Sequence, residues 1–285
     1  MAATLVDLVL ERPALRRRRS FRELVNPGIL LGLLIVLLGT LFLLTDVGRL
    51  DRVYTLFTQP TFSVASIGAY AILFFSLCAG YVVAVRYLAL PEYSAALTRG
   101  VELAGGVFAL GIMAYTGVLL ASMTSVAFWA SPFLPVLFIL SSLSTGIAIL
   151  LICARFLSAQ KALVSALRIV SRADVLILVL EAVAAVLLLV TMYGDASAVA
   201  SAKLLLNGAY AEVFWAGYVV CGLLAPLTVL AFLSGRYTSN LSAWLGVLLL
   251  VGGFCLRYCV VNAGAHDVIV TPFGVLSYLH MTVPA

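Results

Sequence analysis

The sequence predicts an all-α membrane protein, a polytopic bundle of seven transmembrane helices. Of its 285 residues, 64% are hydrophobic and only 10% are charged. The mean hydropathy of +1.18 is far above that of chains that fold around a water-shielded core. A hydrocarbon core about 30 Å thick needs roughly 20 apolar residues per helix. Seven windows have that length: 28–45, 62–85, 100–122, 132–154, 173–193, 208–232 and 242–262. They are continuously apolar rather than alternating, which excludes transmembrane β-strands.

Charge sets the orientation of these helices. If the helices alternate in direction, most of the 17 basic residues fall on one side of the membrane. Those residues are Arg12, Arg16, Arg17, Arg18, Arg19, Arg22, Arg86, Arg99, Arg155, Lys161, Arg168, Arg172 and Arg236. By the positive-inside rule, the N-terminus is cytoplasmic and the C-terminus is extracytoplasmic. The pI of about 9.0 therefore reflects a membrane partner, with anionic lipid at the arginines, and not nucleic acid.

The remaining segments are assigned in chain order. Residues 1–25 form a basic cytoplasmic lead, and they are not a signal peptide because the apolar stretch that follows is long and precedes six further spans. The transmembrane domain covers 26–262. Its outer loops are 46–61, 123–131 and 194–207, and its inner connection 155–173 is predicted to form a short amphipathic helix at the interface. Residues 263–285, with Pro272 and Pro284, form an extracytoplasmic tail.

No metal or haem site is predicted in this protein. The five cysteines lie inside the spans and form no CxxC pair, so they indicate no disulfide frame, thiolate metal site or iron–sulfur cluster. The two histidines, His266 and His280, lie in the tail and cannot ligate a haem within the membrane. No nucleophile triad or phosphate-binding loop is found, which argues against an independent hydrolase.

Four polar residues are expected at one depth near the outer surface. Asp46 ends the first helix and Tyr115 lies in the outer half of the third. Glu212 lies one turn into the sixth helix from the outside, and Arg257 lies in the outer half of the seventh. Polar groups in hydrocarbon need partners or a ligand. A quinone headgroup needs hydrogen-bond donors for two carbonyl oxygens and a proton route, which this set could supply. The alternatives are a structural ion pair of Arg257, an interfacial belt position for Tyr115, and helix ends in water for the two acids.

Glu181 is different, because it lies near the middle of the fifth span. One interpretation is a neutral, buried carboxyl. The other is a step in a proton relay.

The segment "AYTGVLLASMTSVAFWASPFLPVLFILSSLSTGIAIL" resembles the signature helix pair of the polysulfide reductase membrane-subunit family, NrfD/PsrC. That signature has a Tyr-x-Gly in one helix, a Trp at the turn, and a Leu-Pro-x-x-Phe start with Ser-Thr-Gly in the next. "LFLLTDVGRLDRVYTLF", "EVFWAGYVVCGLLAPL" and "GGFCLRYCVVNAG" extend the resemblance over about 30–264. Compared with the family, this sequence is expected to lack a counterpart of the usual first helix.

The resemblance implies a quinone-reactive membrane anchor of a molybdopterin oxidoreductase. Its partners would be a four-cluster iron–sulfur subunit and a catalytic subunit of the polysulfide, thiosulfate, tetrathionate or a related type. Menaquinone or ubiquinone would bind near the outer face, and either direction of electron flow is open. Tyr115, Asp46 and Arg257 fall on the reactive positions, and the expected quinone contacts are Tyr115, Ser122, Trp129, Glu212 and Arg257.

The expected location is a bacterial or archaeal cytoplasmic membrane, and the protein is expected to have no catalytic centre of its own. One alternative is an ion or solute transporter subunit that uses Glu181 with Asp174 or Glu102 as relay carboxylates. A purely structural anchor is the third interpretation.

Overall fold

The computed structural model describes residues 19–46, 63–88, 94–124, 126–156, 161–194, 196–232 and 239–282. Across these residues the protein is helical, and seven of the helices are long and apolar enough to cross a membrane. The predicted fold class is therefore confirmed. The elements are α2 (Arg19–Asp46), α4 (Val64–Tyr87), α5 (Ala95–Ala121), α6 (Phe133–Phe156), α7 (Lys161–Thr191), η1 (Met192–Gly194), α8 (Ala196–Asn207), η2 (Val213–Leu224), α9 (Ala225–Phe232) and α10 (Ser239–Thr282).

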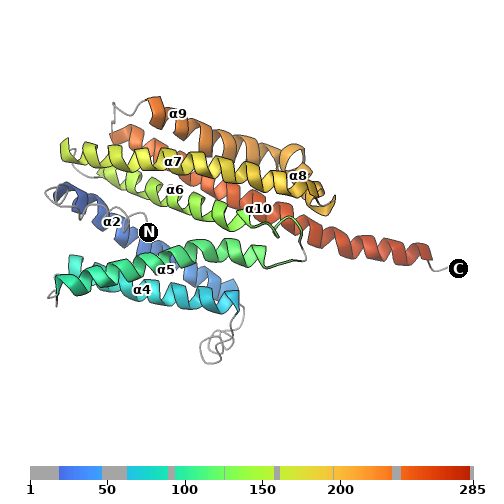
Figure 1. Ribbon diagram of the computed structural model, residues 1–285, viewed down its shortest axis with the longest axis horizontal. Helices are drawn as coiled ribbons and strands as arrows, with labels where there is room; N and C mark the ends of the chain where they lie inside the picture. Colours follow the sequence, from blue (N-terminus) through green and yellow to red (C-terminus); the bar gives the residue numbers. More distant parts are fainter. Residues whose placement is uncertain are drawn as a thin grey trace.

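The helices form two groups that meet along α5 and α6 (Figure 1). We call α2, α4 and α5 the N-terminal half, and α6, α7, η2, α9 and α10 the C-terminal half. Helix α6 is central, since half of its span is buried and it packs against α5, α7 and α10. Only 6% of the α2 span is buried. The packed interior of the protein therefore lies in the C-terminal half.

Serine side chains begin two of the spans. Ser63 Oγ accepts a hydrogen bond from the Ser66 backbone N–H at 3.2 Å, and Ser94 Oγ accepts one from Ala96 N–H at 3.2 Å. Each serine satisfies a donor that the first turn of a helix leaves free, which is the usual role of an N-cap. These caps place the starts of α4 and α5 within a few residues of the apolar windows.

Glycines allow close contact between helices, as is common in membranes. A Cβ on Gly222 of η2 would lie 2.7 Å from the Cα of Gly252 on α10, so the two backbones touch there. Likewise, a Cβ on Gly117 of α5 would lie 2.6 Å from the Cα of Pro135 on α6. Close packing within the C-terminal half and between the two halves therefore depends on glycine positions, which hold no side chain.

Three segments differ from the expected organisation. The outer loop 194–207 contains the helix α8, whose Ala-rich sequence favours a helix. The inner connection does not form a separate interfacial helix within the described residues, because α7 runs without a break from Lys161 into the span. The C-terminal boundary expected at 262 is not a helix end, since α10 continues to Thr282 through Pro272. A proline removes one backbone hydrogen bond and can kink a helix without ending it.

The sixth span contains a π-helix. Twelve residues, Val213–Leu224, follow this wider helical path before α9 completes the span. π-helical turns are rare and often occur at functional sites. The segment carries Tyr218, which is buried, between Gly217 and Gly222, which contact α10. The unusual backbone thus holds a tyrosine inside the C-terminal half.

Candidate functional site

Tyr115 lies near the end of α5 with its ring against α4. A Cβ on Gly68 of α4 would lie 2.3 Å from two ring carbons of Tyr115, so the ring occupies the space that a side chain at Gly68 would need. The side chain is half-buried. Among the described residues its hydroxyl has no hydrogen-bond partner. The ring is therefore held in place while its O–H remains available to a ligand.

The turn after α5 is fastened to α10. The Trp129 indole Nε1–H donates a 3.0 Å hydrogen bond to the Val260 carbonyl, and the indole fills the space beside Gly264. Trp129 is buried, whereas Ser122 is exposed and donates its hydroxyl to the Leu119 carbonyl at 2.7 Å. Trp129 thus joins the two halves at the end of the molecule that carries Tyr115. The Trp129 N–H and the Ser122 O–H already have partners within the protein, while the Ser122 oxygen can still accept a hydrogen bond.

The two acids expected at this level are placed differently. Asp46 is the last residue of α2, and its side chain lies outside the described residues. Glu212 precedes η2 and is exposed, and within the described part of the protein it makes no hydrogen bond or ion pair. No described contact joins Glu212 to Arg257.

Arg257 faces α6 rather than the predicted acids. Its Nη2 donates to Ser142 Oγ at 2.8 Å, and its Nη1 donates to the Gly253 carbonyl at 2.9 Å and to Ser141 Oγ at 3.5 Å. The guanidinium carbon also lies 5.7 Å from the centre of the Phe138 ring, within the range of a cation–π contact. These contacts hold the cation inside the C-terminal half.

Two carboxyls lie in the same interior, on one face of α7. Asp174 is fully buried and Glu181 is 3% exposed. The Glu181 carboxyl lies in the neighbourhood of the Arg257 guanidinium, although no direct ion pair joins them among the described residues. The Ser141 and Tyr218 hydroxyls lie next to Glu181, and the Ser144 hydroxyl lies next to Asp174.

A small cavity lies beside Glu181 and the hydroxyls around it. Its volume of about 10 Å³ is room for about one water molecule, and it is bordered by Ser141, Ser144, Thr145, Glu181 and Tyr218, together with glycines of η2 and α10. Its wall is therefore mostly hydroxyl, carboxyl and backbone. It is a polar chamber in the centre of an apolar bundle.

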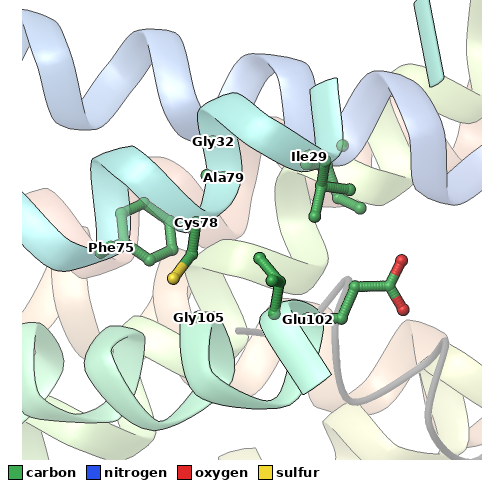
Figure 2. A pocket seen from close by; sticks show the side chains of 10 residues that line it. Ile29, Gly32, Phe75, Cys78, Ala79, Glu102 and Gly105 are labelled. Carbon is green, nitrogen blue, oxygen red and sulfur yellow. The ribbon is translucent and has the colours of Figure 1, made fainter. Parts of the chain in front are cut away.

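A larger, apolar crevice lies in the N-terminal half, between α2, α4 and α5. It has a volume of about 60 Å³, with Phe75 and Cys78 towards one end and Glu102 at the other (Figure 2). Glu102 forms an ion pair with Arg86, which also donates to Asn26 Oδ1 at 2.8 Å. Since Glu102 and Tyr115 are 13 residues apart on α5, about 20 Å along the helix, the crevice and the tyrosine lie towards opposite ends of the bundle.

A model of the family described as Polysulphide reductase, NrfD, matches residues 2–268, nearly the whole sequence. The chain belongs to the NrfD family. The resemblance identified from the helix signatures is therefore confirmed.

Two curated relatives of this NrfD protein agree with that assignment. "Protein NrfD homolog" of Haemophilus influenzae is 30% identical over 154 residues, which cover 53% of this chain and 48% of the relative. The C subunit of the polysulfide reductase of Wolinella succinogenes is 28% identical over 179 residues, which cover 61% of this chain and 56% of the relative. The chain thus spans about half the length of the curated relatives it matches.

The segment that carries the NrfD signature contains only some of the residues of the polar interior. It contains the SSLST run of α6, from which Ser141 and Ser142 hold Arg257 and Ser144 lines the cavity. These serines and Tyr218 were not among the site residues predicted from the sequence. They could have been found as polar residues within two otherwise apolar windows, 132–154 and 208–232. In the part of the protein that the structure describes, no group of three or more His, Cys, Asp or Glu residues could hold a metal ion.

Proposed function

We propose that this protein is the membrane-anchor subunit of a multi-subunit oxidoreductase of the polysulfide, thiosulfate or tetrathionate reductase type. It binds menaquinone or ubiquinone, or the corresponding quinol, near the outer membrane face. It exchanges electrons with a four-cluster iron–sulfur subunit that is joined to a molybdopterin catalytic subunit. Membership of the NrfD family and the likeness to the C subunit of a polysulfide reductase support the assignment to a reductase complex.

The single observation that supports quinone binding is that the Tyr115 ring is fixed by packing while its hydroxyl lacks a hydrogen-bond partner among the described residues. Its ring is packed against Gly68, yet its hydroxyl has no partner among the described residues, although it lies within a membrane span. A phenol O–H in an apolar environment is costly to leave without a hydrogen bond. A quinone carbonyl or quinol hydroxyl arriving from the lipid would supply that bond. Oxidation of one quinol releases two electrons and two protons, and reduction of one quinone consumes the same numbers.

The orientation belongs to the same proposal. The excess of Arg and Lys at the ends of alternate spans supports a cytoplasmic N-terminus and an extracytoplasmic C-terminus. With that orientation, the outer side of the membrane holds Tyr115, the turn that contains Trp129, and the part of α10 around Val260. The iron–sulfur partner would dock there, in a bacterial or archaeal cytoplasmic membrane.

A second candidate is an ion-translocating subunit that uses intramembrane carboxylates. The observation that favours it is the burial of Asp174 and Glu181 beside a polar cavity. It differs from the first candidate in needing no quinone, so a quinone-binding measurement separates the two.

The test is Tyr115→Phe in the assembled complex, measured in membranes with a soluble quinol analogue and by crosslinking of a photoreactive quinone. The change keeps the ring on Gly68 and removes only the hydroxyl. We expect a fall in quinol-linked turnover of about tenfold or more, the equivalent of one hydrogen bond of about 1.4 kcal/mol. The matched control is Tyr193→Phe, since Tyr193 is 77% exposed. Wild-type turnover and crosslinking in Tyr115→Phe would remove quinone binding from this position.

A further inference from the structure

The interior of the C-terminal half contains polar atoms that no described group satisfies. Both carboxyl oxygens of Asp174, the Ser144 hydroxyl and the Tyr218 hydroxyl are buried and have no hydrogen-bond partner among the described residues. Each such atom costs about 1–3 kcal/mol in an apolar interior. Buried water, with two to four polar partners, is the usual way in which proteins satisfy such atoms.

The cavity lies where that water would be needed. Ser144 and Tyr218 border it, and the Glu181 carboxyl forms another part of its wall. Asp174 and Glu181 are seven residues apart, about 10.5 Å along α7, which is too far for direct proton transfer. Ser144 and Ser141 of the neighbouring α6 lie next to Asp174 and Glu181 respectively. Hydroxyls therefore accompany both carboxyls along the gap.

We propose that Asp174, the cavity and Glu181 form a hydrated proton path that enters the bundle from the end at which α7 begins. Asp174 lies five residues beyond Ile169, the first residue of the span, or about 7–8 Å deep. Glu181 lies about 18 Å deep, just past the middle of a 30 Å core. Asp174 takes a proton from entering water and passes it through the Ser144 hydroxyl and a cavity water to Glu181. Asp174, the hydroxyl and the water each accept one proton and release one, Glu181 keeps the proton that it receives, and no electrons move.

Arg257 makes the path end in the bundle. Its guanidinium is held by Ser142, Ser141 and Gly253 at the Glu181 end of the path, away from Asp174. A fixed cation repels hydronium and other cations, which is how positive groups block proton passage in selective pores. The path thus delivers a proton to Glu181 but does not let protons cross the whole membrane. Facing Glu181 are Asp174 on its own helix, Ser141 on α6, Tyr218 on η2 and Arg257 on α10.

The inference goes beyond quinone binding and can be tested without it. The experiment is infrared difference spectroscopy on the purified full-length protein in lipid nanodiscs, following the carbonyl stretch of protonated carboxyls through a pH change and a switch to D₂O. We expect a protonated band that Glu181→Gln removes, and an exchange with D₂O that is complete within seconds in the wild type. Either a band unaffected by Glu181→Gln, or wild-type exchange as slow as that of core backbone amides, would overturn the path.

The role of Asp174 is tested by the isosteric change Asp174→Asn. Removing a positioned proton carrier should slow exchange at Glu181 by about 100-fold, within the range that general acid–base groups contribute. Ser144→Ala should slow it less, since water can replace one hydroxyl. Glu102→Gln is the matched control, because Glu102 pairs with Arg86 outside the cluster, and it should leave the band and its exchange rate unchanged. If Asp174→Asn does not fold, the wild-type exchange rate still decides the proposal. Unchanged exchange in a folded Asp174→Asn would overturn it.

Discussion

The guanidinium of Arg257 on α10 donates a 2.8 Å hydrogen bond from Nη2 to Ser142 Oγ on α6. It is the shortest described link between a charge of α10 and the central helix, and a second, longer bond goes to Ser141. A charged hydrogen bond between helices in an apolar medium stabilises their packing, and it also fixes which way the cation faces.

We expect the Arg257 and Ser142 side chains to show energetic coupling. In a double-mutant cycle of Arg257→Leu and Ser142→Ala, the coupling in the free energy of unfolding should be about 1–2 kcal/mol. The measurement is unfolding of the purified protein in mixed detergent. Pairing Arg257→Leu with Thr40→Ala is the control, since Thr40 bonds only within α2. That pair should be additive, and additivity in the first pair would contradict the contact.

The glycine contact between η2 and α10 should tolerate no side chain. Gly222→Ala would place a Cβ 2.7 Å from the Gly252 Cα, which forces the two helices apart. We expect a loss of about 1–3 kcal/mol, measured as a lower thermal midpoint in detergent. Gly39→Ala is the comparison, because nothing lies within 4 Å of a Cβ there and alanine favours a helix by about 1 kcal/mol. Equal midpoints for the two variants would show that the helices do not touch at Gly222.

A side chain at Gly68 should weaken quinone binding, because it would displace the ring of Tyr115. In Gly68→Ala, the new Cβ would overlap the ring of Tyr115, so the ring must leave its present place. We expect the quinol concentration for half-maximal turnover to rise about tenfold, equivalent to about 1.4 kcal/mol. Gly111→Ala on α5 is the matched control, because its Cβ would meet the Ala71 Cβ at an ordinary 3.6 Å. If both variants need the same quinol concentration, the position of the ring is not what binds the headgroup.

The two ends of the protein should be accessible from opposite sides. With a cytoplasmic N-terminus, an epitope tag after Ala285 should bind antibody on intact spheroplasts, and a tag before Met1 should bind only after permeabilisation. Detergent-treated cells, in which both tags bind, provide the control. The reverse pattern would invert the orientation.

Much of the fold was predictable because apolar length is a local property of the sequence. The window 132–154, for example, corresponds to α6, Phe133–Phe156. The position of a residue along its helix was predictable for the same reason, since each residue adds a fixed rise. The direction in which a side chain points around its helix was not. Arg257 turns towards α6 because Gly252 and Gly253 let α10 approach η2 and Thr145, and that rotation depends on contacts between distant segments. For the same reason the inward direction of Tyr218 was not predicted, since it lies in a π-helix and is buried there.

Because α10 is one continuous helix, a rotation at one point along it displaces its far end. At 1.5 Å per residue its 44 residues measure about 66 Å, roughly twice the hydrocarbon thickness, and Figure 1 shows its C-terminal part reaching beyond the other helices. Arg257 lies on the part that packs against α6. A tilt of about 5° around that point would swing the far tip by roughly 3 Å, given the remaining helix length of about 38 Å. A small tilt of α10 at Arg257 would therefore produce a larger displacement of its C-terminal end, well outside the bilayer.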